Sequence, residues 1–319
     1  MNALPYFSVI IPVHNKLPHL ERSIHSVLQQ TYPNFEVILI DDASTDGSSE
    51  KLREFSHQKL TLLHRTAPGP GGYAARNLGI VKAKYEWVAF LDADDEWKPE
   101  LLQTVHDTIM SNQDQELECV TWGWYSINAT SKILDTTSSK NYRDNLRRFT
   151  ITDFFNHQHI LWTGAVTFKK DLIVRAGLFP ESGFRRGGDV DTWIRCLWYS
   201  KGNIWINKVL SYYYLDAVNM VTKQVQRDAT FLFTPFVKGL IKYSDDQELI
   251  TAIRRFQNRR IYSIIRGQFI DRHKPDYRLI GKMNYSEGYF FLLSKLIYNR
   301  LKYSSRDILS AFSRNRAEG

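Results

Sequence analysis

Residues 87–95 read Trp87-Val88-Ala89-Phe90-Leu91-Asp92-Ala93-Asp94-Asp95. The apolar first half of this stretch is typical of a strand buried in a parallel sheet. Because aspartate is a poor strand former, we expect the strand to stop at Asp92 and to release three carboxylates into a loop. Ligands of open α/β sheets bind at the carboxyl ends of strands, and clustered acids are stabilised by a hard divalent cation. The stretch therefore predicts a metal site at a sheet edge, with a solvated acidic turn as the alternative.

Apolar runs and helical patterns alternate on both sides of this stretch. This order predicts an α/β fold whose mostly parallel sheet is joined by right-handed crossovers. The expected strands are 7–13, 35–40, 60–63 and 119–125, and the expected helices are 20–28, 48–56, 73–80, one beginning near Pro99, 170–176 and one beginning at Asp189. We further expect residues 128–148 to form a mobile insertion and residues 204–206 and 212–215 to form short edge strands.

The charge of the chain is unevenly distributed. Residues 221–319 carry 19 Lys and Arg against 9 Asp and Glu, a net +10, whereas the whole chain of 319 residues has a net charge of +8. This asymmetry predicts two domains, residues 1–220 and a basic, mainly helical region 221–319. It favours an anionic partner for the second region, such as a phospholipid surface or a lipid phosphate; a solvated basic helical face is the alternative. No nucleic-acid-binding motif occurs, so we expect no nucleic-acid partner.

Targeting and redox signals are sparse. The two cysteines, Cys119 and Cys196, predict neither a disulfide framework nor a zinc site and favour a reducing compartment. The first residues lack the pattern of a signal peptide, and no run of about 18 apolar residues predicts a transmembrane helix. We therefore expect a cytoplasmic protein.

Carboxylates follow three predicted elements at one edge of the sheet: Asp41-Asp42, the acids of 92–95, and Asp189. A carboxylate after the second strand can accept hydrogen bonds from a ribose or a base, and an Asp-x-Asp pair can hold a metal against a diphosphate. A further carboxylate across a cleft can serve as a general base. Together these acids predict group transfer from a nucleotide-activated donor.

The chain resembles glycosyltransferase family 2, whose members are inverting enzymes with the Rossmann-like GT-A fold. The resemblance covers residues 5–215 and is most specific in the first hundred. The matching segments are 8–15, 26–31, 35–48, 75–80, 90–95 and 188–195.

The resemblance implies a nucleotide site. Pro12, Val13 and His14 would lie along the base, and Asp42 would contact it, commonly as uracil. Asp92 would face the ribose or the diphosphate and is the alternative metal ligand. Arg76 could reach the diphosphate or the base, with a helix-surface arginine as the alternative.

The resemblance also implies the reacting groups. Asp94 would bind Mg²⁺ or Mn²⁺ at the diphosphate, and Asp189 would deprotonate the acceptor hydroxyl. The family often has Glu-Asp where this chain has Gly188-Asp189. Asp191 is the reserve base, although it lies on another helix face and could instead pair with Arg195.

The expected activity is a metal-dependent, inverting sugar transfer of hexosyltransferase type, from a UDP-sugar to a glycan or lipid-linked acceptor. Surface polysaccharide or lipopolysaccharide synthesis at the inner face of the plasma membrane is the expected setting, with peripheral contact through residues 221–319. A catalytically silent nucleotide-sugar-binding or scaffold protein is the alternative. An oxidoreductase reading of residues 69–74 is disfavoured by Pro70 and by the distance of the glycines from the preceding strand. Asp95 has no firm role, with a supporting contact or a helix cap near Pro99 as options.

Overall fold

The computed structural model describes residues 4–135, 138, 145–156, 160–226, 229–271, 273–285, 288–300 and 302. The chain divides into two compact units, Met1–Val225 and Gln226–Gly319.

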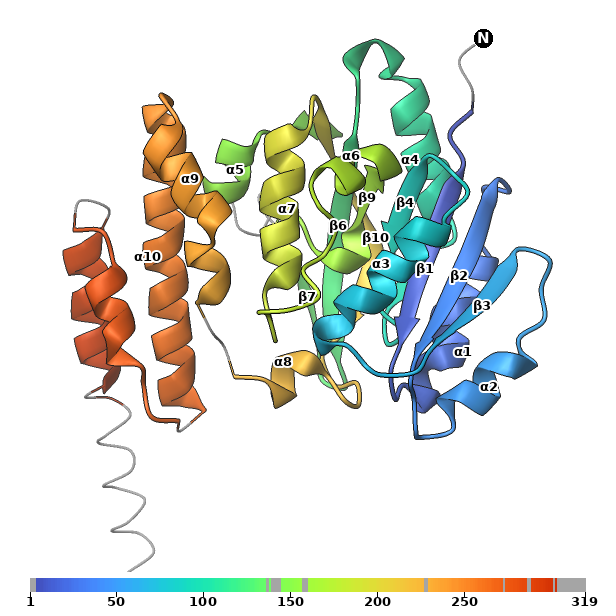
Figure 1. Ribbon diagram of the computed structural model, residues 1–319, viewed down its shortest axis with the longest axis horizontal. Helices are drawn as coiled ribbons and strands as arrows, with labels where there is room; N and C mark the ends of the chain where they lie inside the picture. Colours follow the sequence, from blue (N-terminus) through green and yellow to red (C-terminus); the bar gives the residue numbers. More distant parts are fainter. Residues whose placement is uncertain are drawn as a thin grey trace, which may run out of the picture. The chain divides into compact units, whose positions relative to one another are not determined.

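The first unit is built on one mixed sheet with the strand order β3-β2-β1-β4-β9-β6-β10-β5 (Figure 1). Strands β3, β2, β1 and β4 are parallel, β9 runs antiparallel between β4 and β6, and β10 is parallel to β6. The α/β class with a mostly parallel sheet is thus confirmed. The strands are β1 Phe7–Val13, β2 Phe35–Asp42, β3 Leu60–Arg65, β4 Trp87–Phe90, β5 Glu96–Trp97, β6 Cys119–Asn128, β7 Ser131–Leu134, β8 Leu146–Arg148, β9 Val166–Lys169 and β10 Asn203–Tyr214.

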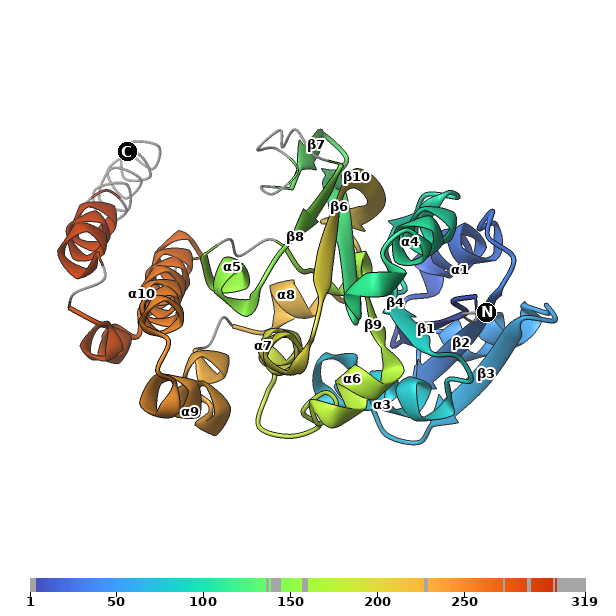
Figure 2. The same cartoon turned by 90° about the horizontal axis from the view of Figure 1, so that it is seen from above.

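Helices cover both faces of this sheet. Seen from above, α1 and α4 lie on one side and α3, α6 and α7 on the other (Figure 2). The helices of the first unit are α1 Leu20–Leu28, α2 Ser48–Glu54, α3 Tyr73–Lys82, α4 Leu101–Met110, α5 Ile151–Asn156, α6 Lys170–Arg175, α7 Gly188–Tyr199 and α8 Val221–Gln224.

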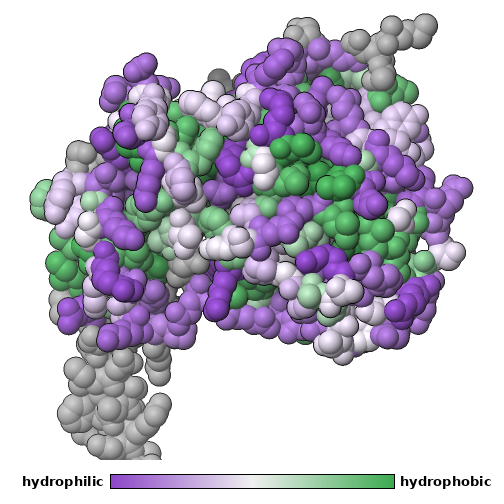
Figure 3. Space-filling model, viewed as in Figure 1, coloured by the Kyte–Doolittle hydropathy of each residue, from purple (hydrophilic) through white to green (hydrophobic). Residues whose placement is uncertain are grey.

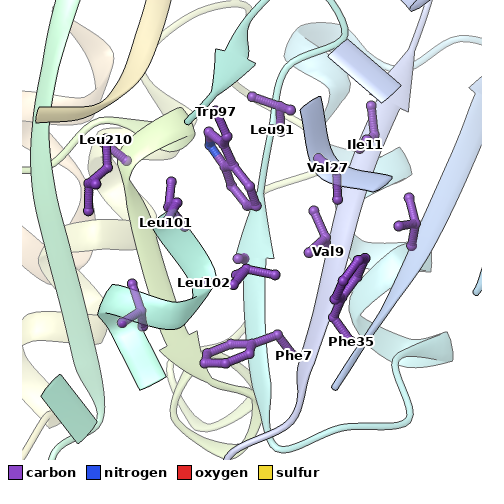
Figure 4. Close-up of a cluster of buried hydrophobic side chains, with 14 of the residues drawn as sticks. Phe7, Val9, Ile11, Val27, Phe35, Leu91, Trp97, Leu101, Leu102 and Leu210 are labelled. Atoms are coloured by element: carbon purple, nitrogen blue, oxygen red, sulfur yellow. The ribbon is translucent and has the colours of Figure 1, made fainter. Parts of the chain in front are cut away.

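Strand β1 is buried on both faces, which explains its uninterrupted apolar sequence. Its odd-numbered residues pack with α1 and α4; Val9 and Ile11 lie near Val27 (Figure 4). On the other face Ile10 meets α3, where a Cβ on Gly79 would lie 2.5 Å from Ile10 Cγ2. A glycine at position 79 therefore lets α3 approach the sheet closely.

Some boundaries differ from those expected. Strand β2 continues past the expected Ile40 and includes the two acids expected at its end, Asp41 and Asp42, whereas β4 ends at Phe90, before Asp92. The two edge strands expected at 204–206 and 212–215 are one strand, β10, which lies between β6 and β5. The register between β10 and β6 shifts after Ile206, so the polar residues there interrupt the apolar pattern without ending the strand.

Residues 128–148 contain regular structure: β7 pairs with β6, and β8 pairs with β10. The mobility expected for 136, 137 and 139–144 concerns positions outside the described residues.

The second unit is helical, as expected for the C-terminal region. It contains α9 Pro235–Tyr243, the 24-residue α10 Gln247–Ile270 and a helix over residues 289–300. Asp246 caps α10 by accepting a hydrogen bond from Leu249 N at 3.0 Å. No helix within the described ranges is long and apolar enough to cross a membrane.

Candidate functional site

The carboxyl ends of β2, β1 and β4 meet at one edge, because β1 pairs in parallel with both neighbours. Pro12 and Val13 end β1, with Val13 opposite Asp41 of β2. His14 follows, largely exposed, and its Nδ1 donates to the backbone oxygen of Asp42 at 2.8 Å. The segment predicted to lie along the base is therefore anchored beside the predicted base-contacting residue.

Asp42 is buried at this edge, and its carboxylate is engaged within the protein. One oxygen pairs with the Arg65 guanidinium, and the other accepts from Gly69 N at 3.1 Å. Asp42 thus fastens the glycine-rich loop before α3 to the end of β2.

The neighbouring carboxylate of Asp41 is also buried and faces β3 and α2. Burial favours its neutral form, but hydrogen bonds from Ser49 and Ser44, with His64 nearby, outweigh this effect and lower the pKa of Asp41. Ser44 N donates to Asp41 Oδ1 at 3.1 Å. Asp41 therefore organises the turn after β2.

Arg76 and Asp92 form an ion pair that joins α3 to the loop after β4. Arg76 is only 6% exposed, and its Nη1 donates to Gly71 O at 2.7 Å, so it is not a helix-surface arginine. The Asp92 side chain is 30% exposed. Arg76 therefore holds Asp92 from the protein side while part of the carboxylate faces solvent.

Asp94 has a partner that the sequence analysis missed. Lys16 Nζ lies 2.5 Å from Asp94 Oδ2, with only 12% and 9% of the two side chains exposed. Burial raises the pKa of Asp94, and the Asp92 charge adds to this, while Lys16 opposes both. Lys16 comes shortly after β1, and Asp94 comes shortly after β4. The pairing of these two strands could therefore have indicated that Lys16 and Asp94 lie close together.

The donor set around Asp94 suits a metal that a substrate helps to bind. The described residues hold no group of three or more His, Cys, Asp or Glu side chains that could bind a metal alone. Mg²⁺ takes only one or two carboxylates when phosphates complete its shell. Asp92 and Asp94 fit that requirement, with Lys16 and Arg76 as the competing cations.

Asp95 supports the loop after β4 from the interior. It is fully buried, and its Oδ1 accepts from Tyr214 N at 2.9 Å. Its Oδ2 has no hydrogen-bond partner among the described residues. Burial, followed by the charges of Asp94 and Asp92, raises the pKa of Asp95 well above its usual value. The cap expected near Pro99 is not seen, since α4 begins after Glu100 without a side-chain cap.

Asp189 lies in the first turn of α7 and is partly exposed. The helix start is held by Tyr73, whose hydroxyl accepts from Gly188 N at 2.9 Å. A Cβ on Gly188 would lie 2.8 Å from the Tyr73 ring, which explains glycine here instead of the family's glutamate. Burial raises the pKa of Tyr73 to about 12, with a further contribution from the Asp189 charge. Tyr73 therefore links Asp189 to the start of α3, one turn before Arg76.

Asp191, the reserve base, is buried and pairs with Arg195 at 2.9 Å, four residues along α7. Arg195 Nη2 in turn donates to Leu178 O at 2.8 Å. Asp191 thus makes the structural pair considered above, which leaves Asp189 as the stronger candidate.

The segment after β10 is fastened to the loop after β1, a connection absent from the sequence analysis. Lys16 Nζ donates to Val218 O at 2.7 Å, and Asn219 Nδ2 donates to Asn15 O at 3.0 Å. Arg186, before α7, donates to Thr222 O at 3.3 Å. Lys16 and Val218 are 202 positions apart and Asn15 and Asn219 are 204 apart, so no local pattern could reveal these two contacts.

Comparisons with known proteins agree with this architecture. Residues 8–173, half of the chain, match the model of Glycosyl transferase family 2. The chain is 28% identical over 266 residues to TuaG of Bacillus subtilis, whose name places it provisionally in teichuronic acid biosynthesis, covering 76% of this chain and 98% of TuaG. It is 34% identical over 121 residues to the glycosyltransferase GlyG of Streptococcus pneumoniae, covering 37% of this chain and 39% of GlyG.

Among solved structures, S. aureus TarS 1–349 in complex with UDP-GlcNAc has a TM-score of 0.68 at 17% identity, covering 92% of this chain and 81% of TarS 1–349. This likeness concerns the fold. Taken with the match of the family model, it shows that the chain belongs to glycosyltransferase family 2 and is a glycosyltransferase with the GT-A fold.

Proposed function

We propose that the protein transfers a sugar from a UDP-sugar to a hydroxyl of a glycan or lipid-linked acceptor in cell-surface polysaccharide synthesis. The observation that carries the proposal is that Asp42, Asp92 and Asp94 lie at one edge of the sheet, where the parallel strands β2, β1 and β4 end. The solved complexes of TarS with UDP-GlcNAc and with UDP support the donor class. The name of TuaG supports a surface polysaccharide as the product.

At the donor end, Pro12, Val13 and His14 lie along the base. Asp42 accepts a hydrogen bond from the base after giving up its contact with Arg65 or with Gly69 N. Arg76 orients Asp92 toward the ribose and the diphosphate. A magnesium or manganese ion held by Asp94, with Asp92 as second ligand, would neutralise charge on the departing diphosphate.

At the acceptor end, Asp189 accepts the proton of the attacking hydroxyl. The hydroxyl oxygen forms a bond to the anomeric carbon as the bond to the nucleoside diphosphate breaks with its electron pair. Attack opposite the leaving group inverts the anomeric configuration, and no covalent enzyme intermediate forms. Tyr73 holds the helix that carries Asp189.

The substitution Asp189→Asn tests the base. Transfer should fall by about 10²–10⁴-fold, while stabilisation by donor and Mn²⁺ should persist. The matched control is Asp171→Asn, an exposed aspartate in the first turn of α6, which should keep full activity. Retained transfer in Asp189→Asn would remove this residue from the base role.

A thermal-shift screen of nucleotide sugars, with and without Mn²⁺, tests the donor and the metal. We expect stabilisation by one nucleotide that requires Mn²⁺ and is lost in Asp94→Asn. Metal-independent stabilisation would contradict the role of Asp94. Donor binding by the wild type with neither transfer nor donor hydrolysis would favour the silent scaffold.

We assign catalysis to residues 1–220 and place the reaction on the cytoplasmic face of the plasma membrane, with lipid-linked repeat units or lipopolysaccharide as acceptors. The net +10 of residues 221–319 supports peripheral contact with anionic lipid.

A further inference from the structure

The helix over residues 289–300 exposes large apolar side chains on one face. Phe290, Phe291, Ile297 and Tyr298 are 73%, 62%, 55% and 64% exposed. Phe290 and Ile297 are seven residues apart, and so are Phe291 and Tyr298. The four side chains therefore share one face of the helix. Leu296, on the opposite face, is only 4% exposed. We call these four exposed residues the aromatic stripe; hydrophobic residues (green) also reach the surface of the second unit at the left edge of Figure 3.

Basic side chains accompany the aromatic stripe. The sequence from 288 to 302 contains Lys295, Arg300 and Lys302 and no acidic residue. Lys295 Nζ lies 4.1 Å from the centre of the Phe291 ring. Nearby in sequence, Tyr285 is 72% exposed, and its ring centre lies 4.6 Å from that of Tyr289. The helix thus combines aromatic rings with cations on long, flexible stems. Lys295 lies against the stripe, and the Arg300 guanidinium lies 5.7 Å from the centre of the Tyr277 ring.

This combination favours one kind of partner. Clustered apolar side chains exposed to water mark an interaction site. If a second copy of the chain packed through the same face, the positive charges of Lys295, Arg300 and Lys302 on the two copies would repel one another. An anionic bilayer accepts aromatic side chains at its interface and attracts the surrounding cations.

We propose that the aromatic stripe docks onto an anionic phospholipid surface, with the helix 289–300 lying in the plane of the interface. The inference rests on the membrane contact proposed above and names the residues that make it. The test measures vesicle binding and not sugar transfer, so its outcome is independent of the assignment of Asp189.

The test is flotation of the full-length protein with vesicles of phosphatidylcholine, with and without phosphatidylglycerol. We expect binding that needs phosphatidylglycerol, and Phe290→Ser/Phe291→Ser should weaken it about 10-fold or more. Lys295→Gln/Arg300→Gln should also weaken it and reduce its salt sensitivity. The control Tyr243→Ser removes a ring that is 75% exposed on α9 and should bind as the wild type does.

Circular dichroism should show unchanged helix content in every variant, because the substituted side chains are exposed. Wild-type levels of vesicle binding by Phe290→Ser/Phe291→Ser would overturn the proposal, as would equal binding to pure phosphatidylcholine or no binding at all. Light scattering that shows wild-type oligomers dissociating in this variant would assign the face to a second copy instead.

Discussion

Replacing Lys16 with methionine should destabilise the first unit strongly. The substitution keeps the length of the side chain but leaves the Asp94 carboxylate, only 9% exposed, without its ammonium partner. Breaking a buried ion pair from one side costs about 3–5 kcal/mol. Val218 O also loses its 2.7 Å donor. Proton uptake by Asp94, whose pKa burial already raises, limits the loss. We therefore expect the free energy of unfolding to fall by about 3 kcal/mol at neutral pH.

The chain offers a selective assay for this change. All 8 tryptophans lie between residues 87 and 205, so tryptophan fluorescence during urea unfolding reports on the first unit alone. The matched control is Lys201→Met, which breaks the Lys201–Glu116 pair, whose side chains are 57% and 69% exposed. This control should leave stability nearly unchanged, because exposed pairs contribute little.

Mn²⁺ adds a second readout. In Lys16→Met, Asp94 lacks its competing ammonium, so Mn²⁺ with UDP should raise the unfolding temperature more than in the wild type. If Lys16→Met is no less stable than Lys201→Met, the buried pair does not stabilise the fold and the reasoning is refuted. An unchanged response to Mn²⁺ would show that Lys16 does not compete with the proposed metal.

Three further substitutions test the packing and the electrostatics of the first unit. Gly79→Ala should lower the free energy of unfolding by about 1–3 kcal/mol despite the better helix propensity of alanine, since the new Cβ would lie 2.5 Å from Ile10 Cγ2; a more stable variant in urea would contradict this packing. Folding lowers the pKa of Asp41, so its carboxylate stabilises the fold above the unfolded pKa of about 3.9, and this stabilisation is lost as the pH falls through the folded pKa. In urea unfolding between pH 3 and 7, the free energy of unfolding should therefore fall less on acidification in Asp41→Asn than in the wild type. Parallel pH dependences of the two proteins would refute the assignment. Tyr73→Phe removes the acceptor for Gly188 N and should cost about 1 kcal/mol and lower kcat more than it changes donor affinity, whereas unchanged kinetics would show that the hydroxyl does not position α7.

The fold was predictable where burial is continuous along the sequence. Strands β2 and β4 are buried throughout and β1 at every position but Pro12, so apolar runs marked them, and their order required a parallel sheet. β10 was misread as two edge strands because polar residues stand at its register shift, although pairing on both sides keeps it one strand.

The acids of the candidate site were predictable from the sequence, but the ion pairs that they form with basic residues were not. The position of Asp94 and Asp92 after β4 followed from the sequence. Their partners lie on other elements, Lys16 after β1 and Arg76 within α3, and only the neighbouring order of β1 and β4 brings Lys16 to Asp94. The hydrogen bond from Gly188 to Tyr73 spans 115 residues, which no local pattern encodes.

The contacts of the loop after β4 also set an order of assembly. Asp95 accepts its hydrogen bond from Tyr214, 119 residues later, and Lys16 reaches Val218, 202 residues later. During synthesis Asp95 therefore lacks this donor, and Lys16 lacks this acceptor, until β10 and the segment after it have left the ribosome. Domains fold as units during synthesis, and distant pairings form slowly. A nascent chain that ends before Tyr214 would thus carry the loop after β4 without the hydrogen bond from Tyr214 to Asp95.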